Sequence, residues 1–155
     1  MVTEGHTTAP CARIAIINGP NLNLTGTREP ELYGSETMEL MLERLRARFA
    51  GVEIDYFQSN IEGELIDAVQ RMGFGCDGLI VNPGGYSHTS VALHDALLAV
   101  PAPAVEVHLS NIFAREDYRH RSLTGSACRG CISGLGMKGY ELALQALTDT
   151  RLGGE

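Results

Sequence analysis

The side chains best suited to acid–base chemistry in this chain are Tyr33, Arg28 and His108. Tyr33 and Arg28 share the irregular stretch 18–33, and His108 ends a short run of β-branched residues. Tyrosine and histidine can take or give a proton, and arginine can stabilise the negative charge that proton transfer creates. The chemistry is therefore predicted to centre on residues 18–33, just after the first strand.

Glu106 lies two residues before His108 in the same run, so both side chains are expected on one face of a strand. A glutamate in a buried apolar strand is costly unless it has a partner, and orienting an imidazole is a suitable role for it. The alternative is a structural ion pair that closes the strand end. We favour the functional interpretation because a strand end would also bring His108 to a ligand crevice.

The segment Asn18-Gly19-Pro20-Asn21 follows the first strand and invites comparison with a phosphate-binding loop. A phosphate loop opens directly into a helix, whereas this stretch runs on to Tyr33, and Pro20 lacks a backbone donor. The segment is therefore not a dinucleotide fingerprint. About fifteen residues without regular structure are uncommon in a compact domain and are often functional, so 18–33 is predicted to be a lid.

Polar side chains follow each of the first four predicted strands. They are Asn18, Asn21 and Asn23, then Gln58, Ser59 and Asn60, then Asn82 and His88, and finally His108, Ser110 and Asn111. Any one set can serve only to satisfy loop backbone, which is the commoner role of loop asparagine. Because all four sets reach the same edge of a parallel sheet, a ligand site is the better explanation.

His88 and Asp95 flank a predicted helix start at Thr89 and Ser90. His88 can be simply a residue that precedes the helix. Asp95 lies two turns further on, close to apolar residues such as Val91 and Leu98. We predict a subunit interface on this face, with an ordinary surface aspartate as the alternative.

Other kinds of catalysis find little support. The single lysine, Lys138, lies in a glycine-rich turn before the last helix, a poor place for a Schiff base. His88 and His108 have no obvious third ligand, so neither a metal nor a cofactor is predicted. Cys128 and Cys131 form a C-x-x-C motif that we interpret as buried thiols, with a redox or metal pair as the lesser alternative.

The elements that position these side chains alternate along the chain. Strands are predicted at 13–18, 52–58, 78–82, 104–108 and 130–133, and helices at 37–50, 62–72, 90–100 and 140–147. This alternation predicts an α/β protein with a flavodoxin-like, doubly wound, five-stranded parallel sheet. Residues 1–12 are expected to form a disordered N-terminal tail, and residues 13–151 a single catalytic domain.

Composition limits the partners. The 155 residues carry a net charge of −7, which argues against nucleic acid, and no stretch is long and apolar enough for a membrane span. No secretory signal is recognisable, so a cytoplasmic protein that acts on a small molecule is expected. The run 115–121 holds three arginines and can bind an anionic substrate.

Three longer motifs resemble those of the type II 3-dehydroquinate dehydratases. They are Asn18-Gly19-Pro20-Asn21-Leu22-Asn23-Leu24 with Arg28-Glu29-Pro30 and Tyr33-Gly34, then 82–90 (NPGGYSHTS), and then 106–111 (EVHLSN). The resemblance extends from about Ile14 to the last helix. Three motifs in the right order are far more specific than any one of them.

The resemblance implies a hydro-lyase that converts 3-dehydroquinate to 3-dehydroshikimate by anti elimination through an enolate, without a cofactor. It implies Tyr33 as the base, Arg28 as the lid group that stabilises the transition state, His108 as the acid and Asn21 as a residue that holds the enolate. It implies a homo-oligomer, a dodecamer built as a tetramer of trimers. The implied substrate contacts are Asn82, His88, Leu109, Ser110, Arg119 and Asp95, the last reaching a neighbouring subunit's site.

The roles are chemically reasonable. A free tyrosine, with a pKa of about 10, is almost fully protonated at neutral pH, so a tyrosine base needs a positive neighbour such as Arg28. The chain departs from the family pattern at Thr25, His94, Cys128 and Cys131, none of which is a catalytic position. The reaction serves either aromatic amino acid biosynthesis through the shikimate pathway or quinate breakdown.

Two rival functions follow from the same residues. A flavin-binding module of flavodoxin type would need a hydroxyl-rich phosphate turn after the first strand, which this chain lacks. A metal-assisted lyase or hydrolase would use His88, His108 and Glu106 and would lose activity in a chelator.

Overall fold

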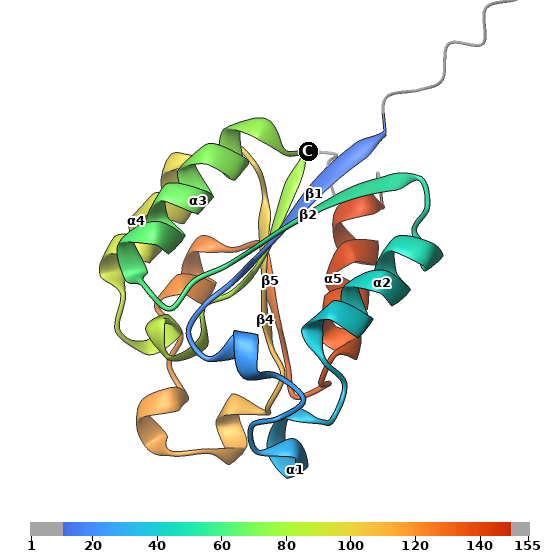
Figure 1. Cartoon of the computed structure of the whole chain (residues 1–155). Helices are drawn as coiled ribbons and strands as arrows, with labels where there is room; N and C mark the ends of the chain where they lie inside the picture. The colour runs from blue at the N-terminus through green and yellow to red at the C-terminus, as the bar shows by residue number, and fades with distance from the viewer. Residues whose placement is uncertain (1–10, 150–155) are drawn as a thin grey trace, which may run out of the picture.

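The computed structural model describes residues 11–149, which form an open sheet of five parallel strands. The strands are β1 (Ala12–Asn18), β2 (Val52–Gln58), β3 (Gly78–Asn82), β4 (Ala104–His108) and β5 (Gly130–Ser133). Their spatial order is β2-β1-β3-β4-β5, which confirms the predicted doubly wound α/β architecture (Figure 1). Ala12, which was predicted to precede the sheet, already belongs to β1, and Ala12 already pairs with Val52. Residues 1–10 and 150–151 lie outside the described part of the chain.

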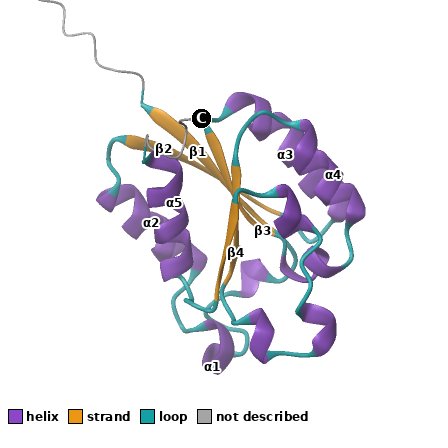
Figure 2. Ribbon diagram, turned by 180° about the vertical axis from the view of Figure 1, so that it is seen from behind, coloured by secondary structure: helices purple, strands orange, loops and turns teal. Residues whose placement is uncertain are grey.

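Helices cover both faces of the sheet (Figures 1 and 2). One face carries α2 (Met38–Arg48) and α5 (Lys138–Thr148), and the other carries α3 (Glu62–Gly75) and α4 (Val91–Ala99). The inner strands β1, β3 and β4 are mainly apolar on both sides for this reason. In β1, Ile14 and Ile16 join the core under α2 and α5, while Ala15 and Ile17 join the core under α3 and α4.

The helix starts follow their capping residues. The hydroxyl of Thr37 accepts a hydrogen bond from the N–H of Leu40, and that of Ser90 accepts one from the N–H of Leu93. These bonds satisfy backbone donors that a helix start leaves free, so α2 and α4 begin directly after the two caps.

The predicted helices are all present, but every boundary except the start of α3 differs by one to three residues, and two of these differences have a clear consequence. The third helix, α3, continues three residues past the predicted end at 72, although glycine disfavours helix. A Cβ atom on Gly73 would lie 2.5 Å from side-chain atoms of Val100, so close packing between helices requires glycine there. The last helix begins at Lys138, which is therefore not in a turn and pairs with Glu141.

The stretch 18–33 is more ordered than predicted. It contains a 3-10 turn at Leu22–Leu24 and a short helix, α1 (Pro30–Tyr33). Pro30 occupies the first helical position, where its missing N–H costs nothing, and the Thr25 hydroxyl donates to the carbonyl of Leu22 at 2.6 Å. The prediction of a structureless lid is wrong in this respect, because local turns satisfy the backbone. No helix among the described residues is both long and apolar enough to cross a membrane.

Candidate active site

A pocket of about 130 Å³ opens at the carboxyl ends of β1, β3 and β4. This is the crevice that an open parallel sheet offers to ligands. All the predicted site residues line it except Glu106 and Asp95. The lining residues predicted from sequence are Asn21, Arg28, Tyr33, Asn82, His88, His108, Leu109, Ser110 and Arg119.

The Tyr33 ring has two guanidinium groups close to it. The Arg28 carbon Cζ is 5.1 Å from the centre of the Tyr33 ring, and that of Arg115 is 5.7 Å from it. Positive charge beside a phenol stabilises the phenolate that forms when the hydroxyl loses its proton. Arg115 was not among the predicted site residues, although it belongs to the arginine-rich run 115–121 and lines the pocket.

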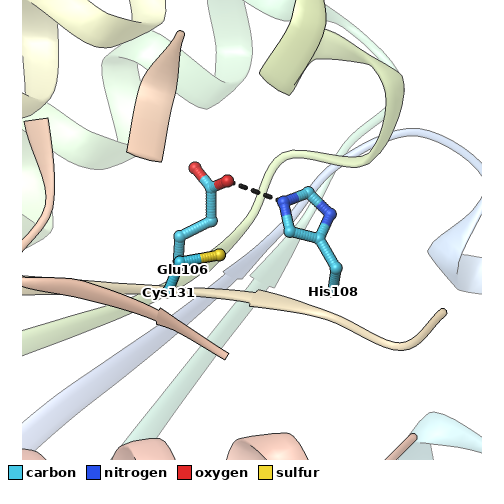
Figure 3. A group of neighbouring side chains, drawn as sticks. All are labelled: Glu106, His108 and Cys131. Carbon is cyan, nitrogen blue, oxygen red and sulfur yellow. Dashed lines mark hydrogen bonds and ion pairs between the residues drawn. The ribbon is translucent and has the colours of Figure 1, made fainter. Parts of the chain in front are cut away.

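His108 is held by Glu106, as the two-residue spacing predicted. Its Nε2 atom lies 2.6 Å from the Glu106 carboxylate. Figure 3 shows the imidazole and the carboxylate joined by this contact. Within the described residues His108 makes no other side-chain hydrogen bond, so Nδ1 is available to a ligand. His108 lines the pocket from β4 while Glu106 lies behind it, fully buried.

The Glu106 carboxylate receives two further hydrogen bonds that the sequence did not reveal. The Ser122 and Thr124 hydroxyls donate to it, each at 2.5 Å. Burial by itself would raise the pKa of Glu106, but the bond and charge of His108 and these two hydroxyls outweigh it, and the pKa is lowered. Glu106 is therefore an ionised, immobile carboxylate behind His108.

His88 stacks against His108 from the other side. The ring centres are 6.3 Å apart with 19° between the planes, and His88 Nδ1 lies 2.8 Å from the carbonyl oxygen of Arg121. Burial lowers the pKa of His88, so the ring is neutral at neutral pH. His88 ends the 3-10 turn Gly84–His88 and is not part of α4, so it does not share a helix face with Asp95.

The floor of the pocket depends on close backbone approach between two loops. A Cβ atom on Gly19 would lie 2.5 Å from the carbonyl oxygen of Pro83, so only glycine fits there. Asn21 has a left-handed backbone with φ of 69°, and its N–H donates to the Asn60 side chain at 3.0 Å. Gln58 donates to the Gly19 carbonyl. The polar set after β2 thus supports the loop and does not line the pocket.

Asn82 is fixed from below by a buried tyrosine. Its amide Nδ2 donates to the Tyr140 hydroxyl at 3.0 Å, and that hydroxyl donates to Asn18 Oδ1 at 2.8 Å. Burial raises the pKa of Tyr140, so the hydroxyl keeps its proton. Tyr140 of α5 therefore links the ends of β1 and β3 directly under the pocket.

Replacing Tyr140 by phenylalanine is expected to lower the free energy of unfolding by about 1–3 kcal/mol, because two buried amide groups lose their partner. Asn82 also loses the acceptor that holds its amide in place, so the substitution should raise KM by a larger factor than it lowers kcat. Denaturant unfolding and steady-state kinetics check both. Tyr56→Phe is the matched control, because the Tyr56 hydroxyl meets Asn18 only at 3.5 Å. Equal stability of wild type and Tyr140→Phe would contradict the role given to this network.

The basic end of the pocket is formed by arginines of the segment 115–121, which follows β4. Arg115 Nη1 donates to the Ser110 hydroxyl at 3.4 Å, and Arg119 Nε donates to Glu116 at 2.8 Å. Both arginines line the pocket and are mostly covered. This end can bind an anionic group such as a carboxylate.

Asp95 lies away from the pocket. It projects from α4, its side chain is 69% exposed, and it pairs with His94 at 3.0 Å. Val91 and Leu98 of the same helix are exposed as well. Within this single subunit, Asp95 therefore does not join the other predicted site residues.

The two cysteines of the C-x-x-C motif are not alike, so the prediction of two buried thiols is half wrong. Cys128 is partly buried and its thiol donates to the Thr124 carbonyl at 3.4 Å. Cys131 is exposed, because it lies on β5 at the edge of the sheet. Both thiols are free.

Comparison with known protein sequences points to one family. The family model described as dehydroquinase class II matches residues 12–148. A 3-dehydroquinate dehydratase of Methylococcus capsulatus is 54% identical over 138 residues, covering 87% of this chain and 93% of that protein. One of Carboxydothermus hydrogenoformans is 52% identical over 139 residues, covering 88% and 90%.

Solved structures agree. The type II dehydroquinase of Butyrivibrio crossotus has a TM-score of 0.85 and 42% identity, covering 89% of this chain and 98% of that one. The type II dehydroquinase of Propionibacterium acnes has a TM-score of 0.83 and 39% identity, covering 88% and 97%.

Proposed function

This chain belongs to the class II dehydroquinase family and is a hydro-lyase that dehydrates 3-dehydroquinate, and we propose that Tyr33 and His108 carry out the two halves of the reaction. The observation that supports this division of labour is that both side chains line one pocket, each with its own supporting groups. Tyr33 has two guanidinium neighbours, and His108 has a buried carboxylate.

The first half is removal of a proton from the carbon next to the substrate ketone. Tyr33 takes this proton as a phenolate, stabilised by Arg28 and Arg115. The electrons left on carbon move onto the ketone oxygen and give an enolate. Asn21, in the rigid floor of the pocket, helps to hold this enolate, and a fixed polar group costs little reorganisation when charge develops.

The second half is loss of the hydroxyl group from the adjacent carbon. His108 gives a proton to the departing oxygen, so that water leaves and the enolate collapses to the conjugated enone 3-dehydroshikimate. Glu106 acts as a positioning residue, because it keeps the imidazole in one orientation and stabilises its protonated form. The whole reaction needs no external oxidant, reductant or cofactor.

The substrate is a carboxylate with several hydroxyl groups, and the pocket lining matches this chemistry. Asn82, His88 and Arg119 contribute polar side chains, and Leu109 and Ser110 line the end of β4. The carboxylate is assigned to the basic end near Ser110, where the arginines gather.

The most direct experiment is to add 3-dehydroquinate to the purified protein and follow the ultraviolet absorbance of the conjugated enone. We expect rapid formation of 3-dehydroshikimate that a chelator does not reduce. The absence of turnover by folded protein would contradict the function.

Arg115 is expected to be as important for turnover as Arg28, the arginine that was predicted from the sequence. Arg115→Met should lower kcat by roughly 10²-fold, because one of the two charges that stabilise the Tyr33 phenolate is lost. Arg121→Met is the control, since the Arg121 side chain is exposed and lines no part of the pocket. An unchanged kcat for Arg115→Met would leave Arg28 as the sole support of the phenolate.

Asp95 is assigned to the active site of a neighbouring subunit in a homo-oligomer, a dodecamer. The exposed apolar residues Val91 and Leu98 on the same helix support an interface there. Light scattering should give an assembly of many subunits, and a monomeric mass would contradict this assignment.

A further inference from the structure

A cysteine from the edge of the sheet completes a group of three possible metal ligands beside His108. Strands β4 and β5 pair so that Glu106 lies opposite Cys131. The ligand atoms of Glu106, His108 and Cys131 all lie within 4.8 Å of one another. Figure 3 shows the three side chains gathered around one gap, with the Cys131 sulfur extending toward it.

The donor set suits a borderline-soft cation. Imidazole nitrogen, carboxylate oxygen and thiolate sulfur are the three ligand types of protein zinc sites, with bonds of about 2.0–2.3 Å. Glu106 accepts hydrogen bonds from His108, Ser122 and Thr124, which leaves one of its roughly four acceptor positions open. Ser122 and Thr124 also hold the carboxylate in place, as partners of metal ligands commonly do.

Cys131 is accessible, and its thiol has no role in the proposed reaction. It is exposed, so an ion can reach the group from solvent, and it makes no hydrogen bond within the described residues. Partial burial and the charge of Glu106 raise the pKa of the Cys131 thiol to about 11. The thiol therefore keeps its proton until a metal displaces it. The proposed dehydration makes no use of this side chain.

We propose that Glu106, His108 and Cys131 bind Zn²⁺ and that the bound ion stops the dehydration. The ion takes Nε2 of His108, a Glu106 oxygen and the Cys131 sulfur, with a water molecule as the fourth ligand. The proton that Nε2 donates to Glu106 moves by way of solvent to Nδ1, so the imidazole stays neutral, and the thiol proton goes to solvent. Tetrahedral ligands stand roughly 3.5 Å apart, so the 2.6 Å contact between His108 and Glu106 opens by less than about 1 Å.

Inhibition follows from where the ion binds. With metal on Nε2, the imidazole can no longer carry a second proton, so His108 cannot act as an acid toward the leaving hydroxyl. This consequence rests on the proposed role of His108, whereas metal binding itself does not. The two must therefore be measured separately.

The first measurement is turnover of 3-dehydroquinate by chelator-treated full-length protein at increasing Zn²⁺. Wild type should lose activity, and Cys131→Ser should need roughly 10- to 100-fold more Zn²⁺ for the same loss. Without metal, Cys131→Ser should turn over at the wild-type rate. Cys11→Ser, which changes another exposed thiol, and Cys128→Ser should keep the wild-type sensitivity.

The second measurement uses Co²⁺ as a spectroscopic probe and needs no activity. Wild type should show a near-ultraviolet thiolate-to-cobalt absorption band that is absent in Cys131→Ser and present in Cys128→Ser. Equal Zn²⁺ sensitivity of wild type and Cys131→Ser, or no cobalt band in wild type, would overturn the site. A Cys131-dependent band with undiminished turnover would keep the metal site but reject both its effect and the role assigned to His108.

Discussion

Tyr33→Phe is expected to lower turnover of 3-dehydroquinate by roughly 10³- to 10⁴-fold while substrate analogues still bind. Phenylalanine keeps the ring close to Arg28 and Arg115, so the pocket retains its shape and its positive charges. Only the hydroxyl that would accept the substrate proton is removed. Steady-state kinetics and calorimetric titration with a non-reactive analogue measure the two effects independently.

The chain offers a close control for this substitution. Tyr118 also has a guanidinium over its ring, with the Arg119 carbon Cζ at 5.1 Å, but it is exposed and does not line the pocket. Tyr118→Phe should therefore turn over at close to the wild-type rate. If Tyr33→Phe kept comparable activity, another base would have to remove the proton.

His108→Gln is expected to lower turnover by roughly 10³-fold for a different reason. Glutamine can still donate a hydrogen bond to Glu106, so the buried carboxylate keeps a partner. The substitution therefore leaves no unpaired buried charge that would destabilise the fold. It cannot give up a proton to the departing hydroxyl. Chemical denaturation should accordingly show only a modest change in stability.

Exchange of the substrate's hydrogen with solvent distinguishes Tyr33→Phe from His108→Gln. In D₂O, a protein that removes the proton but cannot expel the hydroxyl returns deuterium to 3-dehydroquinate, which NMR detects. His108→Gln should catalyse this exchange without forming 3-dehydroshikimate, whereas Tyr33→Phe should catalyse neither. Loss of exchange in His108→Gln would mean that His108 also takes part in proton removal.

The two sides of the pocket differ in how firmly they are built. His108 ends a central strand and rests on a carboxylate with three hydrogen-bond donors. Tyr33 ends the short helix α1, and Arg28 precedes Glu29, whose backbone is left-handed with φ of 39°. A rigid acid and a base on a short surface element are consistent with a lid that brings Tyr33 over bound substrate.

Much of the fold followed from local patterns. Four of the five strand ranges were predicted residue for residue, and β1 differed only by Ala12. The inner strands β1, β3 and β4 are buried on both faces along most of their length and have a mainly apolar composition that marks them clearly. Helix ends were less predictable. Gly73, in the last turns of α3, packs against Val100, the residue that follows α4, and no pattern within α3 contains this contact.

The amino-acid sequence by itself determined the strands, the polar side chains at their carboxyl ends and the Glu106–His108 pair. These features are local, because a strand alternates its faces every two residues and parallel strands end at one edge. Tertiary structure alone decided that Arg115 lies over Tyr33, that Tyr140 joins Asn18 to Asn82, and that Cys131 lies opposite Glu106. Such pairs depend on strand register and helix packing, which arise from the sum of many weak contacts across the core.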